Sequence, residues 1–201
     1  MAQGFQRFSR DVFPARAALF EKLATTHRPT ALFIGCSDAR VVPELITQTD
    51  PGELFVIRTA GNIVPPYARG ADGVAASVEY AVSALGVSDV IVCGHSACGA
   101  MTALASDGDL TGLPAVAGWL HHADASKART DAGGELTRAD RVTALVRDNV
   151  VAQLANLRTH PSVAKAMARN RVTLHGWVYD IGTGSAEMLD ATGERFIALA
   201  G

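Results

Sequence analysis

Cys36, His95 and Cys98 carry side chains that together could bind one metal ion. His95 and Cys98, with two residues between them, follow the apolar run Val90–Cys93, and Cys36 ends a second apolar run at 31–36. Two thiolates and an imidazole favour zinc among the divalent metals. A structural zinc site normally has four such ligands, whereas a catalytic site keeps one position open. Three evident ligands therefore predict a catalytic zinc.

Each of these residues, taken singly, has a simpler interpretation. Free cysteines are most often small buried hydrophobes, and a lone histidine is often a hydrogen-bonded core residue. Cys93 is such a case, because it lies inside an apolar run with no polar neighbours. We predict that Cys93 belongs to the core, and that the other three residues act together at the ends of two strands.

Asp38 and Arg40 follow Cys36 at spacings of two and four residues. A surface ion pair is the simpler interpretation, and such pairs contribute less than about 1 kcal/mol. Beside a metal, however, the carboxylate can serve as a fourth ligand or accept a hydrogen bond from bound water. Arg40 would keep that carboxylate ionised and oriented through a bidentate pair. We therefore predict a catalytic role for Asp38 and Arg40.

Two other features invite different interpretations. Gly94–Cys98 resembles the G-x-S-x-G turn of serine hydrolases, but Cys98 replaces the last glycine. The candidate bases His160 and His175 have no supporting context. Arg58, a charge near the end of an apolar run, is either an ion-pair partner, with Glu44 as a candidate, or an anion-binding residue.

Short apolar runs alternate with helical patterns, which predicts an α/β fold. The pattern indicates a mostly parallel central sheet of about four strands plus a C-terminal edge strand or hairpin, flanked by helices. Parallel sheets place their chemistry at the carboxyl ends of the strands, so we expect Cys36 and His95 to meet there. The expected strands are 31–36, 54–57, 89–93 and 172–179, with a hairpin within 187–198; the main expected helices are 11–26, 72–85, 113–130 and one opened by a capping box at Thr137–Asp140.

Composition limits the classes of function. The 201 residues are 48% hydrophobic and 19% charged, with a formal net charge of −2 and no Lys/Arg cluster. This balance indicates a globular chain and argues against nucleic acid or an anionic membrane surface as partner. We find neither a run of eighteen apolar residues nor the apolar core of a signal peptide. Three cysteines, an odd number, fit a reduced compartment. We predict a cytoplasmic protein.

At these residues the chain resembles the β-class carbonic anhydrases over about 30–192. The segments that carry the resemblance are Cys36-Ser-Asp-Ala-Arg40, Pro51–Asn62, Ser77-Val-Glu-Tyr80, Gly94–Gly99 and His175–Asp180. The resemblance implies a single domain over 1–201, with an N-terminal helical arm at 1–28 and a catalytic core at 30–192. It also implies one zinc ion per chain and a homodimer or higher even-numbered homo-oligomer, in which the N-terminal helix wraps a neighbour.

The resemblance further implies the reversible hydration of carbon dioxide to bicarbonate and a proton, through a zinc-bound hydroxide. By position, Cys36, His95 and Cys98 are zinc ligands, and Asp38 and Arg40 form the catalytic dyad, with Asp38 able to close the site as a fourth ligand. Phe55, Tyr80, Gly99 and Ala60 match substrate-pocket positions, the first two contributed across a dimer interface. His27 stands where the family often has glutamine.

Two alternative functions stay open at this point. A related zinc hydrolase of the same fold could act on carbonyl sulfide or carbon disulfide, a choice that depends on pocket width. A non-catalytic zinc protein is the other alternative, and the Asp38–Arg40 pair speaks against it.

Overall fold

The computed structural model describes residues 1–70 and 73–199. Within these residues, a six-stranded sheet has the order β2-β1-β3-β4-β5-β6. The first four strands in this order are parallel, and β5 and β6 add an antiparallel hairpin at one edge. The predicted parallel sheet with its C-terminal hairpin is confirmed. The strands are β1 Ala31–Cys36, β2 Leu54–Thr59, β3 Asp89–His95, β4 Thr173–Tyr179, β5 Ala186–Leu189 and β6 Phe196–Ala198.

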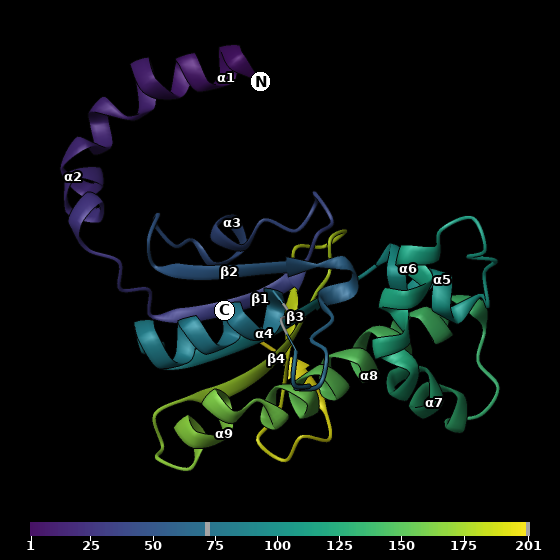
Figure 1. The fold of residues 1–201 in the computed structure, drawn as a ribbon. Coiled ribbons are helices and arrows are strands. Elements are labelled where there is room, and N and C mark those ends of the chain that lie inside the picture. Colours follow the sequence, from purple (N-terminus) through teal and green to yellow (C-terminus); the bar gives the residue numbers. More distant parts are fainter. Residues whose placement is uncertain (71–72, 200–201) are drawn as a thin grey trace.

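Helices lie against and beside this sheet (Figure 1). The largest apolar core packs α4, α8 and α9 against one face of the sheet. A second core, with Cys36 and Cys98 in it, joins α5, α6 and α8 beside the carboxyl ends of the strands. The helices of the core are α3 Pro43–Thr47, α4 Gly73–Glu79, α5 Gly99–Ala105, α6 Pro114–Leu120, α7 Asp124–Ala132, α8 Arg138–Thr159 and α9 Pro161–Met167.

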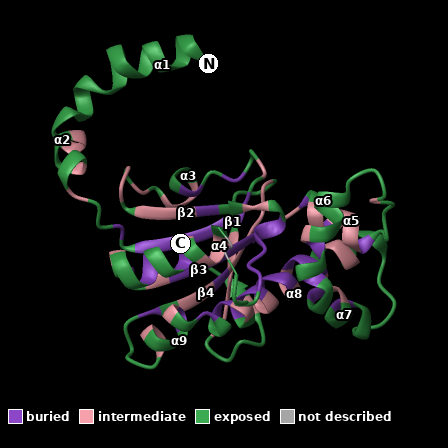
Figure 2. Ribbon diagram, viewed as in Figure 1, coloured by how far each residue is buried: buried purple, intermediate pink, exposed green. Residues whose placement is uncertain are grey.

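Burial follows the strand patterns (Figure 2). Every residue of β1 is buried, and so are all residues of β3 after Asp89. Strands covered on both faces carry continuous apolar runs, which is why these two were recognisable from sequence. Cys93 is 1% exposed, within the small core that also contains Phe33 and Ile91, as predicted. Its burial raises the pKa of its thiol to about 12.

The N-terminal segment extends away from the sheet (Figure 1). It comprises α1 Ala2–Arg7, a π-helical turn at Phe8–Val12, a 3-10 turn at Pro14–Arg16 and α2 Ala17–Thr25. None of these elements contains a buried residue. The predicted helix at 11–26 is therefore longer and more irregular than expected, since helical structure begins at Ala2. We call residues 1–25 the arm.

Several predicted boundaries differ from the structure; β2, for example, extends to Thr59 and not to 57. β3 continues through His95, two residues beyond the expected end at 93. The helix expected at 72–85 consists of α4 and a π-helical segment, Tyr80–Leu85, and ends at Gly86, where φ is 72°; position 72 lies outside the described residues. The helix expected at 113–130 is divided into α6, a 3-10 turn at His121–Ala123 and α7.

Candidate metal centre and active site

The three predicted metal ligands meet at the carboxyl ends of β1 and β3. Cys36 is the last residue of β1, His95 the last of β3, and Cys98 immediately precedes α5. Their ligand atoms all lie within 4.8 Å of one another, and all three residues are buried. Ligands of one tetrahedral zinc ion lie about 2.0–2.3 Å from it, so this cluster is compact enough to hold a single ion.

The imidazole of His95 is oriented for metal binding. Its Nδ1 lies 2.9 Å from the Ser96 carbonyl oxygen, which fixes Nδ1 as the protonated nitrogen. Its Nε2 is buried and has no hydrogen-bond partner among the described residues. A buried polar atom without a partner is costly, and a metal ion would satisfy it. The residues present therefore fit zinc.

The two cysteine sulfurs of the cluster also favour a bound metal ion. A hydrogen bond from Cys98 lowers the pKa of Cys36, and the same contact raises the pKa of Cys98 because a second buried thiolate would be repelled. The backbone N–H of Gly61 also donates to Cys36 Sγ, at 3.4 Å. The first proton thus leaves readily, whereas removal of the second calls for a bound cation.

Asp38 and Arg40 form the predicted bidentate pair beside this cluster. Arg40 Nε and Nη2 donate to the two carboxylate oxygens at 2.9 and 2.7 Å, and the Arg40 backbone N–H donates to Oδ1 at 2.9 Å. These hydrogen bonds hold the pKa of Asp38 well below its ordinary value. Asp38 Oδ2 lies 4.0 Å from His95 Nε2. The structure therefore has Asp38 paired with Arg40 and adjacent to the metal position.

Arg58 bonds backbone carbonyls, a role that was not considered from sequence. Its guanidinium donates to the backbone carbonyls of Cys36, Asp38 and Val41 at 3.0, 2.6 and 2.8 Å. It makes no ion pair with Glu44 among the described side chains. A loop carbonyl that is partly shielded from water needs a donor, and Arg58 makes three such bonds to one loop. Arg58 therefore fixes the loop that connects Cys36 with the Asp38–Arg40 pair.

The expected pocket residues divide into two groups. Ala60 and Gly99 flank the cluster, because Gly61 contacts Cys36 Sγ and Gly99 follows Cys98. Phe55 lies near the opposite end of β2, paired in register with Leu32, four residues before Cys36. At about 3.3 Å per residue, it is more than 10 Å along the sheet from this chain's own cluster. Tyr80 and His27 lie with it, at ring-centroid distances of 5.9 and 6.2 Å from Phe55.

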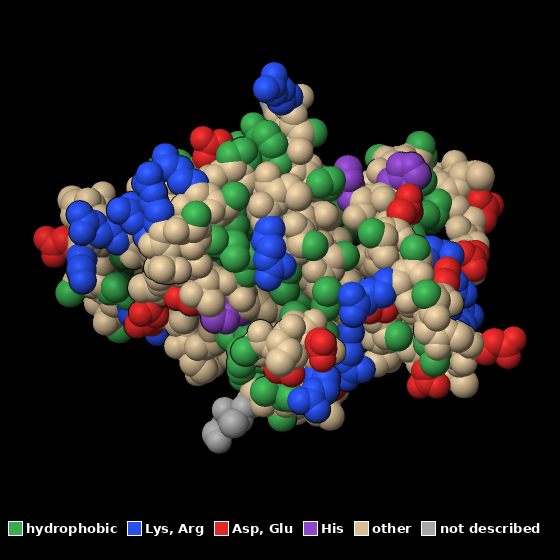
Figure 3. All heavy atoms as spheres, turned by 90° about the horizontal axis from the view of Figure 1, so that it is seen from below, with side chains coloured by type: hydrophobic (Ala, Val, Ile, Leu, Met, Phe, Trp, Pro, Cys, Tyr) green, Lys and Arg blue, Asp and Glu red, His purple; other side chains and the backbone are tan. Residues whose placement is uncertain are grey.

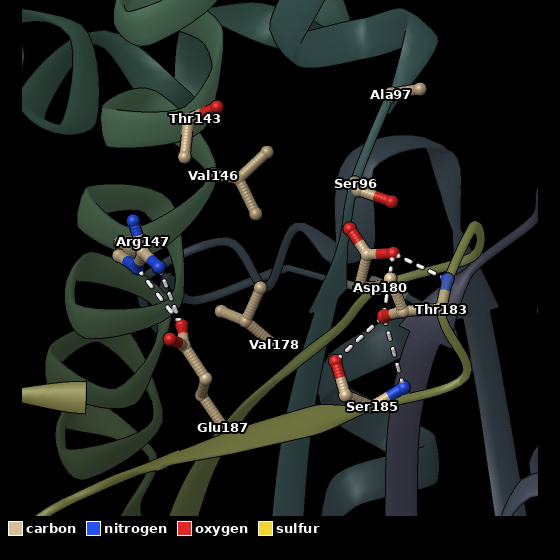
Figure 4. Close-up of a pocket in the computed structure, with 10 residues that line it drawn as sticks. All are labelled: Ser96, Ala97, Thr143, Val146, Arg147, Val178, Asp180, Thr183, Ser185 and Glu187. Carbon is tan, nitrogen blue, oxygen red and sulfur yellow. Dashed lines mark hydrogen bonds and ion pairs between the residues drawn. The ribbon is translucent and has the colours of Figure 1, made fainter. Parts of the chain in front are cut away.

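The loop between His95 and Cys98 contacts the dyad on one side and a cavity on the other. The Ala97 carbonyl accepts a hydrogen bond from Arg40 Nη2 at 3.1 Å. Ser96 and Ala97 also line a cavity of about 310 Å³ with Val146, Val178 and the Arg147–Glu187 ion pair (Figure 4). None of the three metal-cluster residues lines this cavity.

The described residues do not form a serine hydrolase site around Ser96. The Ser96 hydroxyl accepts a hydrogen bond from the Ile181 N–H. The two candidate bases are engaged elsewhere: His160 bonds the Pro65 carbonyl, and His175 bonds Asp89. The G-x-S-x-G likeness therefore has no catalytic counterpart in the fold.

Sequence reasoning missed a set of buried amides on α8. Asn149 and Gln153 are fully buried, and Asn156 lies one turn further along the same helix face. The signal was available, because these three residues interrupt the apolar stripe of α8 at spacings of four and three. They bond the loop that follows β2. Sequence reasoning also missed Trp119, whose Nε1 donates to the Ala60 carbonyl at 2.9 Å.

The sequence and the fold both match known proteins. A family model described as carbonic anhydrase matches residues 31–186. The solved structure of the β-carbonic anhydrase CcaA superposes with a TM-score of 0.94 at 42% identity, over 98% of this chain and 97% of that chain. This chain belongs to the β-class carbonic anhydrases.

Curated relatives agree with this assignment to the carbonic anhydrases. The chain is 62% identical to a carbonic anhydrase of Pseudomonas aeruginosa over 197 residues, which cover 98% of this chain and 90% of that protein. It is 54% identical to carbonic anhydrase 1 of Escherichia coli O157:H7, with the same coverage. The solved β-carbonic anhydrases of Sordaria macrospora, described as tetrameric, include a chain that matches with a TM-score of 0.81 at 30% identity, over 100% of this chain and 95% of that chain.

Proposed function

We propose that this protein catalyses the zinc-dependent, reversible hydration of carbon dioxide to bicarbonate and a proton. The observation that carries the proposal is the Cys36–His95–Cys98 cluster with the Asp38–Arg40 pair at its edge. Membership of the carbonic anhydrase family supports the same reaction.

The metal centre and the dyad have separate tasks in this proposal. Zinc held by Cys36, His95 and Cys98 would supply Lewis acidity, which makes water more acidic near neutral pH. The Asp38 carboxylate, ionised because Arg40 lowers its pKa, would accept a hydrogen bond from the reacting water and orient it toward carbon dioxide. Arg40 and Arg58 hold Asp38 in this position. Such orientation reduces the entropic cost of reaction.

The substrate pocket is proposed to include residues from a second copy of the chain. Ala60 and Gly99 lie beside the metal cluster, whereas Phe55 and Tyr80 are too far along the sheet to reach it within one chain. Tyr80 is 49% exposed, although it is a large aromatic residue. A homodimer, or a higher even-numbered assembly, would bring Phe55 and Tyr80 to the partner's metal site and complete its apolar wall.

The arm is the proposed means of association. Four phenylalanines on it, Phe5, Phe8, Phe13 and Phe20, contact one another, and none of them belongs to the apolar cores of the described residues. A group of large exposed apolar side chains such as these phenylalanines marks an interaction surface. The tetrameric state described for the Sordaria macrospora enzymes supports an even-numbered assembly.

We also propose a cytoplasmic location, which the three free cysteines support. None of the helices within the described residues is long and apolar enough to cross a bilayer. On the face seen in Figure 3, Lys and Arg side chains gather in groups with Asp and Glu side chains close by.

Stopped-flow hydration of carbon dioxide by zinc-loaded protein tests the proposal, with carbonyl sulfide offered as a competing substrate. We expect rapid hydration and little turnover of carbonyl sulfide. Preferred turnover of carbonyl sulfide would assign the protein to the alternative hydrolases. Stoichiometric zinc without turnover of either substrate would leave a non-catalytic zinc protein.

A further inference from the structure

Gly61 connects a buried side chain of α8 with one of the metal-binding sulfurs. Its N–H donates to Cys36 Sγ at 3.4 Å, and its carbonyl accepts a hydrogen bond from Asn149 Nδ2 at 2.9 Å. The residue adopts φ 70°, and a Cβ there would lie only 3.0 Å from side-chain atoms of Ala100 and Met101. Glycine is therefore required at this point, and its orientation is set from both sides.

Asn149 can present only its N–H group to Gly61. Its Oδ1 accepts hydrogen bonds from Gln153 Nε2 at 2.9 Å and from Ser126 Oγ at 3.2 Å. The Gln153 Oε1 in turn accepts the backbone N–H of Val64 at 2.9 Å. Because Asn149 is fully buried, all of its polar atoms must be satisfied inside the protein. The network thus fixes which end of the amide faces the Gly61 carbonyl.

We propose that Asn149 is a positioning residue for the metal centre, acting through Gly61. By holding the Gly61 carbonyl, Asn149 aims the Gly61 N–H at Cys36 Sγ. An N–H donor withdraws electron density from a thiolate, so Cys36 donates less charge to the metal and the metal becomes a stronger Lewis acid. Groups that orient and tune metal ligands in this way typically alter metal affinity by about 10- to 100-fold. The inference rests on the proposed zinc site.

Asn156 offers a control within the same network. It lies on the same helix, and its Nδ2 donates to the Val64 carbonyl at 2.8 Å and to Gln153 Oε1 at 3.1 Å. Its loss leaves the hydrogen bond between Asn149 and the Gly61 carbonyl in place. Val64 makes no described hydrogen bond to Cys36, so this bond should secure the loop without tuning the sulfur. Comparison of Asn149→Leu with Asn156→Leu separates an effect on the metal from a general loss of loop stability.

Cobalt substitution provides a readout other than activity. We expect the thiolate-to-cobalt charge-transfer bands of Asn149→Leu to move to lower energy, because a thiolate without its N–H donor gives up an electron more easily. Asn156→Leu should keep the wild-type bands. We also expect the zinc affinity of Asn149→Leu to differ about tenfold from that of the wild type, measured by competition with a chromophoric chelator. Identical spectra and affinities for the two variants would overturn the inference.

A measurement on the wild-type protein covers the case in which a variant does not fold. With an NMR-active cadmium isotope in place of zinc, a scalar coupling between cadmium and the Gly61 amide proton should pass through Cys36 Sγ. If protein with full cadmium occupancy shows no such coupling, the hydrogen bond from the Gly61 N–H to Cys36 Sγ, on which the inference depends, is refuted. Wild-type protein that binds no metal would instead refute the proposed function.

Discussion

Replacement of Asp38 by asparagine removes the charge that the dyad places beside the metal, while the three metal ligands stay unchanged. Asp38 accepts three hydrogen bonds from Arg40. In Asp38→Asn, the amide NH2 must face either a guanidinium donor of Arg40 or the reacting water. A hydrogen bond to a charged group contributes about 1.5–3 kcal/mol, and each 1.36 kcal/mol corresponds to a tenfold change in rate. We therefore expect kcat/KM to fall by about 10- to 150-fold, with zinc retained.

The assay combines stopped-flow hydration of carbon dioxide with zinc analysis of the same samples. Asp131→Asn is the matched control, because Asp131 also accepts hydrogen bonds from basic side chains, Lys127 and Arg141, but lies on α7 outside the metal cluster. It should keep wild-type turnover. Full turnover in Asp38→Asn would refute the proposed role of this carboxylate, and loss of zinc would show that Asp38 itself binds the metal.

Four further predictions follow from the same geometry. Cys98→Ser should lose stoichiometric zinc, since a hydroxyl is a poor substitute for a thiolate, and retained zinc in metal analysis would contradict the ligand assignment. In Arg58→Lys, the lysine cannot make all three hydrogen bonds to the loop carbonyls. The variant should keep zinc but lose up to about 100-fold in kcat, and an unchanged kcat would show that Arg58 does not position the dyad. The lowered pKa of Asp38 belongs to the folded state, so the dyad's contribution to stability is complete above the ordinary value of 3.8 and is lost only as the pH falls through the lowered pKa. The Asp38 carboxyl should therefore stay ionised from about pH 6 to about pH 9, and a carboxyl carbon NMR signal of Asp38 that titrates in this range would contradict the assignment. Removal of residues 1–25 should shift the assembly toward monomers in sedimentation experiments and lower activity. An unchanged assembly would show that the arm does not hold the copies of the chain together.

The metal cluster was predictable because its positions are tied to strong local patterns. Continuous apolar runs identify β1 and β3, and the ends of parallel strands share one edge of the sheet. Cys36 and His95 each end such a strand, so two local patterns were enough to bring distant residues together. The terminal hairpin was predictable for a similar reason, since Asp190–Gly193 is a turn between two apolar segments.

The supporting interactions were not predictable, because they depend on backbone groups that leave no pattern in the sequence. Arg58 bonds three carbonyls, and a carbonyl is present at every position of the chain. The polar interruption of the α8 stripe by Asn149 was visible in the sequence, but its partner, the carbonyl of Gly61, was not. The arm is a different case: a helix was expected at 11–26, but its irregular start at Ala2 was not, and none of its elements contains a residue buried by this chain.

Zinc titration of metal-free protein tests the central claim most directly. The metal would be removed with a chelator under reducing conditions, and carbon dioxide hydration would be followed as zinc is returned. We predict that activity rises linearly and stops at one zinc ion per chain, and that Cys36→Ser, His95→Ala and Cys98→Ser each abolish the response. Carbon dioxide hydration by the metal-free protein, or an unchanged response in any of the three variants, would contradict the account.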